Sequence, residues 1–267
     1  MLRPFPLLFK MTTVRKRWRT QLLRRVSTVG AIAAVLNIAV LNTGILNVVV
    51  PNAIVSDGGV RLSLIGPRPA LALPREDVIE ILSSIPVFVI LRGNNRFATG
   101  ALQADAQQSQ IMVFTHAADA QAYLASQPDL AADTEARVMP VWLSDLYQGQ
   151  GLDRLALIPN RASVAAAIEL DSAFTRGVPL FVVKRGDGYV AARQNGEAVV
   201  PMFLARSDVQ PLASALSISA QTDPVTINVL PLGAVIRTLE QGTEPALGQI
   251  RLFPASETVD YLRDRQS

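Results

Sequence analysis

The chain has no cysteine and a single histidine, and these shortages exclude several kinds of chemistry. Without cysteine there is no disulfide, no thiolate nucleophile and no Cys-ligated zinc. His116 has no second His or Cys to complete a ligand set, and its place just before a predicted helix favours a solvent-facing residue over a general base. The Gly-rich phosphate loops and the G-x-S-x-G nucleophile elbow are also absent. We therefore predict no catalytic residues, no cofactor and no metal site, and a protein that is not an enzyme.

Basic side chains are scarce in most of the chain, although the whole sequence is basic. The sequence has 25 Lys and Arg against 22 Asp and Glu, a net charge of +3. Ten of the basic residues and one acidic residue, Asp57, lie within residues 1–72, so the remainder carries 15 basic and 21 acidic residues, a net charge of −6. Binding to nucleic acid requires basic charge gathered on the binding surface. We predict no nucleic-acid partner.

Residues 1–72 contain the pattern of an export segment. Lys and Arg cluster between Arg15 and Arg25 and precede residues 29–50, which carry no charged side chain. This order is typical of a signal peptide or a membrane anchor. The uncharged stretch is long for a signal and about long enough to cross a bilayer, whereas Ala70-Leu71-Ala72 forms an A-x-A cleavage pattern.

We predict cleavage between Ala72 and Leu73, with an uncleaved anchor that contacts the membrane through residues 29–50 as the alternative. In both cases the basic residues stay on the cytoplasmic side and residues 73–267 are translocated. Met1 and Met11 are both acceptable starts, because the residues between them add nothing that export requires.

The rest of the sequence contains an ordered internal repetition. Four segments of the first half return in the same order in the second half: Pro86–Gly93 as Pro179–Gly186, Phe114–Gln121 as Phe203–Gln210, Val138–Val141 as Val229–Leu232, and Leu157–Pro159 as Leu252–Pro254. We predict a pseudo-two-fold duplication of an α+β unit of about 95 residues. The units are residues 73–173 and 174–267, packed as one body and preceded by the N-terminal signal or anchor segment of residues 1–72.

Hydrophobic periodicity and turn residues predict the same kinds of element in both units. In the first unit we expect helices over residues 76–84, 117–126, 143–148 and 162–174, and strands over 86–91, 97–102, 111–114, 137–142 and 155–158. In the second unit we expect helices over residues 207–216, 232–241 and 255–264, and strands over 179–184, 189–193, 198–204, 225–230 and 249–253.

Two of the predicted strands are apolar on both faces. Val87–Leu91 and Leu180–Val183 show no alternation of apolar and polar residues, and such strands are normally buried on both sides. The helices of an α+β unit tend to cover one face of its sheet. The second face is then either covered by the sister unit or partly open, and an open apolar face is a binding surface.

Few residues outside these strands suggest a site. Asp119 and Asp208 recur in the two units one turn into a helix, where the helix dipole explains an acid. Large, adaptable side chains gather around residues 137–142 and the turn that follows, and in the second-unit counterpart. They fit core packing or an apolar groove that receives unfolded chain. The groove residues are then Met139, Trp142, Leu146, Tyr147, Leu232 and Ile236.

The ordered motifs resemble a known family. They are Leu71–Pro74, Ile85–Phe88, Phe114 with Asp119–Ala122, and Arg137–Val141 in the first unit, and Gly177–Val182, Pro201–Leu204 and Asn228–Leu232 in the second. Together they resemble the 22-kDa subunit of the chloroplast inner-envelope translocon and its cyanobacterial relatives. The N-terminal segment differs from the Ser-rich transit peptides of the plant proteins and looks like the export signal of the cyanobacterial branch.

The resemblance implies a soluble, pseudo-symmetric α+β protein with apolar grooves and no catalytic residues. It also implies a place in the intermembrane space of plastids or the periplasm of cyanobacteria, and a chaperone-like role in precursor import or outer-membrane biogenesis. Under this resemblance, the open apolar face becomes the favoured option over coverage by the sister unit.

Three functional hypotheses follow. The leading one is a non-enzymatic, periplasmic, chaperone-like factor in protein transport. Its partners are unfolded or precursor proteins and the outer-membrane protein assembly and translocation machinery. The second is a structural adaptor of an envelope assembly, anchored in the inner membrane. The third is an enzyme or small-ligand binder that uses a cleft between the units, for which the sequence offers no convergent polar residues.

Overall fold

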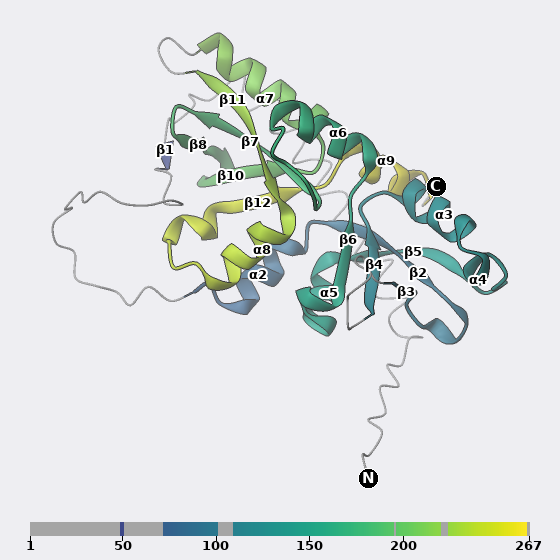
Figure 1. Ribbon diagram of the computed structural model, residues 1–267. Coiled ribbons are helices and arrows are strands. Elements are labelled where there is room, and N and C mark those ends of the chain that lie inside the picture. Colours follow the sequence, from purple (N-terminus) through teal and green to yellow (C-terminus); the bar gives the residue numbers. More distant parts are fainter. Residues whose placement is uncertain (1–48, 51–71, 101–108, 195, 220–223, 266–267) are drawn as a thin grey trace.

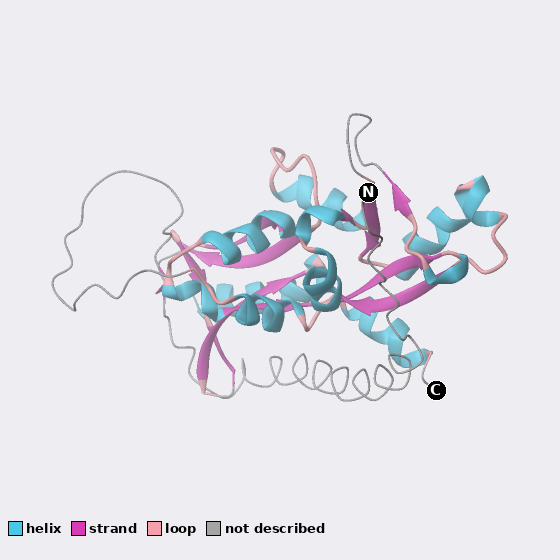
Figure 2. Ribbon diagram, turned by 90° about the horizontal axis from the view of Figure 1, so that it is seen from below, coloured by secondary structure: helices cyan, strands magenta, loops and turns pink. Residues whose placement is uncertain are grey.

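The structure, a computed structural model, describes residues 49–50, 72–100, 109–194, 196–219 and 224–265. These residues form eight α-helices and two β-sheets, so the predicted mixed α+β fold is confirmed. Figures 1 and 2 show the two sheets in separate halves of the molecule, with helices against both. The predicted export segment lies almost entirely outside the described residues. Within them, no helix combines the length and the apolar character that crossing a membrane requires.

The elements follow the predicted order closely. The first half contains α2 (Arg75–Leu82), β2 (Pro86–Leu91), β3 (Thr99–Gly100), β4 (Gln110–Phe114), α3 (Ala117–Ser126), α4 (Pro128–Ala131), β5 (Arg137–Trp142), α5 (Leu143–Gln150), β6 (Leu155–Ile158) and α6 (Arg161–Leu170). The second half contains β7 (Pro179–Arg185), β8 (Gly188–Val190), β9 (Ala192–Gln194), β10 (Glu197–Phe203), α7 (Arg206–Ser219), β11 (Val225–Pro231), α8 (Leu232–Gln241), β12 (Ile250–Phe253) and α9 (Ser256–Asp264).

A few elements differ from the prediction. The short helix α4 was not predicted, and the helix expected over residues 162–174 ends at Leu170. The strand expected over residues 189–193 is divided into β8 and β9, which pair with different strands. Outside the two halves, β1 (Val49–Val50) pairs with β8 in antiparallel orientation.

The two sheets repeat one pattern of pairing. In the first sheet, β4 pairs with β2 in antiparallel and with β6 in parallel orientation, and β2 pairs with β5. In the second, β10 pairs with β7 in antiparallel and with β12 in parallel orientation, and β7 pairs with β11. Phe88 lies opposite Phe114, as Phe181 lies opposite Phe203. The strands β2, β4, β5 and β6 therefore correspond to β7, β10, β11 and β12.

The ladders correct one of the four sequence matches. Pro140 lies opposite Phe88, and the residue opposite the equivalent Phe181 is Val229. Pro231 lies opposite Pro179, so its counterpart is Trp142, opposite Pro86. The sequence match that aligned Pro140 with Pro231 is thus two residues out of register. A shift of two keeps every side chain on the same face of a strand, so the apolar pattern alone could not reveal it.

Both faces of the central strands are covered. In β2, Val87 and Val89 point into the largest core cluster while Phe88 and Ile90 point into a separate one beneath α3. The β7 side chains divide in the same way: Leu180 and Val182 enter the largest cluster, and Phe181 and Val183 a third one beneath α7. Every residue of these runs is at most 1% exposed. The option of an open apolar strand face, which the resemblance favoured, is therefore wrong for β2 and β7.

Each half also supplies one helix to the outer face of the other half's sheet. Ala167 on α6, the last helix of the first half, packs with Phe181 and Phe203 of the second sheet. Leu262 on α9, the last helix of the second half, packs with Phe88 and Phe114 of the first sheet. Figure 1 shows α9 lying beside α3 in the other half of the molecule. Neither sheet is therefore covered by its own half of the sequence alone.

The inner faces share one core with α2, α5 and α8. Val78, Ile81 and Leu82 on α2 are buried in this cluster together with residues of both sheets. The helix contacts α5 of its own half and α8 and β12 of the other. Fully burying a large aliphatic side chain contributes about 1.5–3 kcal/mol. The helix α2 thus stabilises the contact between the halves, and Leu73, at its N-terminal side, packs against the same core.

Candidate functional site at the junction of the halves and on the sheet edges

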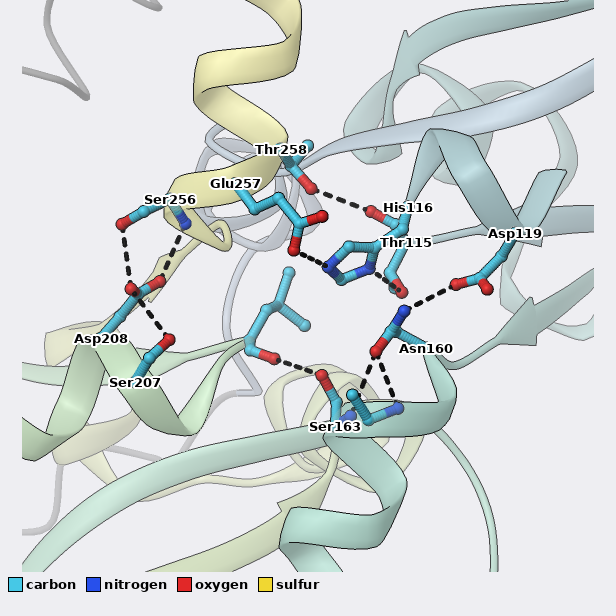
Figure 3. A network of polar contacts seen from close by, with 12 residues as sticks. Thr115, His116, Asp119, Asn160, Ser163, Ser207, Asp208, Ser256, Glu257 and Thr258 are labelled. Atoms are coloured by element: carbon cyan, nitrogen blue, oxygen red, sulfur yellow. Dashed lines mark hydrogen bonds and ion pairs between the residues drawn. The ribbon is translucent and has the colours of Figure 1, made fainter. Parts of the chain in front are cut away.

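The N-terminal ends of α3, α6, α7 and α9 carry a network of polar contacts, called here the junction (Figure 3). Ser163 Oγ donates to the Leu204 carbonyl at 3.5 Å, so that α6 is joined to the end of β10. In the same way, Thr258 Oγ1 donates to the Thr115 carbonyl at 3.2 Å and joins α9 to the end of β4. These two bonds fasten each exchanged helix to the opposite half.

The two recurring acids, Asp119 and Asp208, both belong to the junction. Asn160 caps α6 by accepting from two backbone N–H groups and donates its own Nδ2 to Asp119 Oδ2 at 2.9 Å. At the equivalent end of α9, the cap residue is Ala255, which has no side-chain acceptor. Asp208 takes this role by accepting from Ser256 N and Ser256 Oγ, each at 2.9 Å. The acids therefore hold a neighbouring helix in place, beyond the dipole effect predicted from their position.

Asp208→Ala is expected to lower the free energy of unfolding by about 0.5–2 kcal/mol, the usual cost of losing an N-cap acceptor. The matched variant Asp119→Ala should cost less, because Asp119 accepts from the Asn160 side chain and Asn160 still caps α6. Urea unfolding of both variants measures the difference. Equal losses would show that Asp208 does not act as the cap of α9.

His116 lies in the same junction but is buried, which corrects the prediction of a solvent-facing residue. It is 7% exposed. Its Nδ1 lies 3.1 Å from Thr115 Oγ1, and its Nε2 lies 3.9 Å from Glu257 Oε2 on α9. One of its neighbours, Glu257, belongs to α9, which follows His116 by about half of the chain. No sequence pattern around His116 contains that information.

The polar side chains of the junction are largely occupied by contacts with one another and with the backbone. No group of three or more His, Asp or Glu within the described residues is placed to hold a metal ion. Glu257 has an 83% exposed side chain, and the serine hydroxyls of Ser163 and Ser256 are occupied by a carbonyl and a carboxylate. The polar groups of the junction bind one another and join secondary-structure elements.

A second contact between the halves involves Tyr147 on α5. Its hydroxyl donates to Glu240 Oε1 on α8 at 2.7 Å, and the Arg75 guanidinium of α2 lies over its ring. Burial raises the pKa of Tyr147 to about 12, and the neighbouring Glu240 carboxylate adds to the shift. The hydroxyl therefore stays protonated at neutral pH and serves as a donor between α5 and α8.

Five of the six residues predicted to line an apolar groove are buried. Trp142, Leu146, Tyr147, Leu232 and Ile236 are all buried, and Met139 is half-buried and packs on the core. The default interpretation of these side chains, core packing, describes their place. The size and flexibility of these side chains indicated that they make contacts. They did not indicate whether the contacts are within this chain or with another protein.

Two sheet edges, β5 and β11, carry rows of half-exposed apolar side chains. Within the described residues, β5 pairs only with β2 and β11 only with β7. Both strands carry partly accessible apolar residues and a proline: Val138, Met139, Pro140 and Val141 on β5, and Val225, Ile227, Leu230 and Pro231 on β11. An edge strand presents unpaired backbone groups to which an extended peptide can bind. These edges are the candidate protein-binding surfaces.

The comparisons with known proteins identify the family. The model of the Tic22-like family matches residues 20–260, which is most of the chain. The chain belongs to the Tic22-like family. This result confirms the resemblance inferred from the duplicated motifs.

Solved Tic22 structures share the fold of this Tic22-like chain. Anabaena Tic22 (protein transport) is 22% identical, with a TM-score of 0.60, and the match covers 72% of this chain and 97% of that protein. Tic22 from Plasmodium falciparum is 15% identical, with a TM-score of 0.53 and coverage of 71% and 97%. At this level of identity the likeness concerns the fold. Among proteins of curated function, no match was found.

Proposed function

We propose that this Tic22-like protein is a non-enzymatic, chaperone-like factor in protein transport. The observation that carries the proposal is the family match over residues 20–260, together with a fold shared with Anabaena Tic22, whose name includes protein transport. The junction supports it, because its polar groups are engaged in holding helices and form no catalytic arrangement. The proposed partners are unfolded or precursor proteins and the outer-membrane protein assembly and translocation machinery.

In this proposal, β5 and β11 bind extended segments of a client. Each edge offers a row of backbone hydrogen-bonding groups beside half-buried apolar side chains. Such a surface accepts many sequences, because main-chain bonds supply most of the affinity and adaptable side chains such as Met139 tolerate different neighbours. Pro140 and Pro231 each lack one backbone donor and limit permanent pairing between edges.

The function is tested by the aggregation of an unfolded outer-membrane β-barrel precursor, followed by light scattering. The purified protein is expected to slow aggregation at a molar ratio near one. If the precursor aggregates equally fast with and without it, the carrier function is excluded. In parallel, cross-linking in the cell followed by mass spectrometry is expected to recover precursors or the outer-membrane assembly factor. Recovery of inner-membrane proteins alone would favour a membrane-anchored adaptor.

A pair of edge variants tests the proposed binding surface. Met139→Lys combined with Leu230→Lys should abolish most of the protection against aggregation, because a charged side chain on an edge strand opposes pairing with another chain. Ala122→Lys combined with Ala125→Lys is the matched control: it adds the same charge at exposed positions of α3, outside both edge strands, and should leave protection nearly unchanged. Thermal unfolding of all variants separates loss of binding from loss of fold. Equal protection by both variants would place the client elsewhere.

We also propose that the protein acts in the periplasm after export of a cyanobacterial type. The predicted cleavage point supports this, because Ala72 is exposed while Leu73 packs on the core, so a cut between them keeps both halves and removes only β1 of the described elements. Intact-mass measurement of the protein from the cell envelope should give an N-terminus at Leu73. A full-length chain that resists carbonate extraction would instead establish the anchor through residues 29–50.

The corresponding halves further support an origin by duplication. The four main strands of each sheet pair in the same order, and three of the four sequence matches fall at equivalent ladder positions. We propose that a single α+β unit was duplicated and that exchange of the last helix then joined the copies.

A further inference from the structure

The helix α6 has an apolar outer face that its counterpart α9 lacks. Both helices begin three residues after the end of an equivalent strand, β6 or β12, so their positions correspond one to one. The buried sides agree, since Ala166 and Ala167 of α6 occupy the places of Tyr261 and Leu262 of α9. The accessible sides do not agree: the face of α6 carries an exposed isoleucine, and the face of α9 is polar or charged.

On α6, the accessible face is apolar in the middle and charged at its ends. Among the described residues, Ile168 is the one exposed large hydrophobic residue, with 47% of its surface accessible. Ala162 and Ala165 lie beside it and are also exposed, while Arg161 and Glu169 flank them. The equivalent face of α9 consists of polar or charged residues: Ser256, Glu257, Asp260, Arg263 and Asp264. Within α9, the charges also pair, with Arg263 Nη1 2.9 Å from Asp260 Oδ1.

The face of α6 is complementary to itself. If two copies of α6 lie antiparallel and centred on Ala165, then Arg161 is level with Glu169 of the second copy, and the reverse pair forms at the other end. Ile168 is level with the small Ala162 of the second copy, which leaves room for its side chain. A two-fold interface requires this kind of self-complementary patch. The same arrangement of α9 places Asp260 against Asp260, where like charges repel.

We infer that α6 is the contact surface for a second copy of this chain in an antiparallel, two-fold symmetric dimer. The occupant follows from the charges, because an apolar client segment alone gives no reason for opposite charges at matched distances from Ala165. The pair of helices buries less than the roughly 1,200 Å² of a standard stable interface. The dimer is therefore weak and dissociates on dilution. The dimer contact uses α6 and not the strands β5 and β11, so the inference does not depend on the proposed transport function.

The absence of cysteine allows a direct test in the protein purified after expression of the full chain. In Ala165→Cys the two thiols meet at the symmetry axis, and a disulfide requires Cα atoms within about 7 Å of each other. Mild oxidation should form a linked dimer at least about tenfold faster than in Asp260→Cys, the matched exposed position on α9, because association raises the local thiol concentration. Adding Ile168→Asp to Ala165→Cys should reduce the rate to that of Asp260→Cys. Equal rates for the two single-Cys variants, or no effect of Ile168→Asp, would overturn the inference.

A charge exchange tests the register independently. In the Ala165→Cys background, Arg161→Glu places like charges at both ends of the contact and should slow cross-linking severalfold. The double change Arg161→Glu with Glu169→Arg restores opposite charges and should recover the rate. Because Glu169 also pairs with Arg206 at 2.7 Å in the same chain, thermal unfolding confirms that each variant is folded. A double variant that cross-links no faster than Arg161→Glu would exclude the antiparallel register centred on Ala165.

Discussion

Leu262→Ala is expected to lower the free energy of unfolding by about 2–5 kcal/mol, the range for truncating a buried leucine. Leu262 is 2% exposed and packs with Phe88 and Phe114 on the outer face of the first sheet. Its neighbour Tyr261 adds an edge-on contact to Phe88, with ring centroids 5.5 Å apart. The side chain thus belongs by sequence to the second half and by packing to the first. Its loss leaves a cavity that α9 alone cannot close.

Urea unfolding of Leu262→Ala beside Arg263→Ala measures this effect. Arg263 is the adjacent exposed residue and pairs with Asp260 on the surface, so its loss should cost less than about 1 kcal/mol. Removal of residues 256–267 extends the test: the first sheet then loses the part of its outer cover that α9 supplies, and the loss of stability should exceed that of Leu262→Ala. If Leu262→Ala is as stable as Arg263→Ala, α9 is not docked on the first sheet and the exchange of helices is refuted.

Leu82→Ala is expected to cost a similar amount, about 2–5 kcal/mol, for a different reason. Leu82 is fully buried on α2, and α2 contacts α5, α8 and β12. A cavity at Leu82 therefore weakens the contact between the halves as well as the packing of either one. We expect a single unfolding transition at a lower urea concentration, because the two halves share this core and unfold together.

The control is Glu80→Ala, on the exposed side of the same helix, which should change stability by less than about 0.5 kcal/mol. Two separate transitions in Leu82→Ala, one for each half, would show that the halves are stable independently of the shared core. The position also bears on export, because the predicted cut after Ala72 keeps α2, whereas any cut beyond Leu82 removes it.

Local elements could be predicted from the sequence because they depend on nearby residues. The helix over residues 117–126, the strand over 137–142 and the helix over 232–241 have the bounds that periodicity and turn residues indicated. The apolar runs of β2 and β7 also indicated burial on both faces. The ordered repetition indicated two corresponding sets of strands and the resemblance to the family that the comparisons confirmed.

The partners of these elements could not be predicted, because they come from distant parts of the chain. The apolar pattern of β2 is the same whether a helix of the first half or α9 covers Phe88. Likewise, the apolar pattern of α6 does not indicate which sheet the helix packs on. Five of the six predicted groove residues are buried for this reason: Tyr147 and Ile236, for example, were recognised as contact residues, and only the shared core decided that their contacts are internal.

The sequence by itself determined the type and order of the elements, the correspondence of the two halves and the family, since each depends on residue identity and spacing along the chain. The tertiary structure alone decided the register of β11, the burial of His116, the exchange of α6 and α9, and which apolar side chains remain accessible. Burial is a property of packing between segments far apart in sequence, and similar apolar patterns are compatible with several such packings.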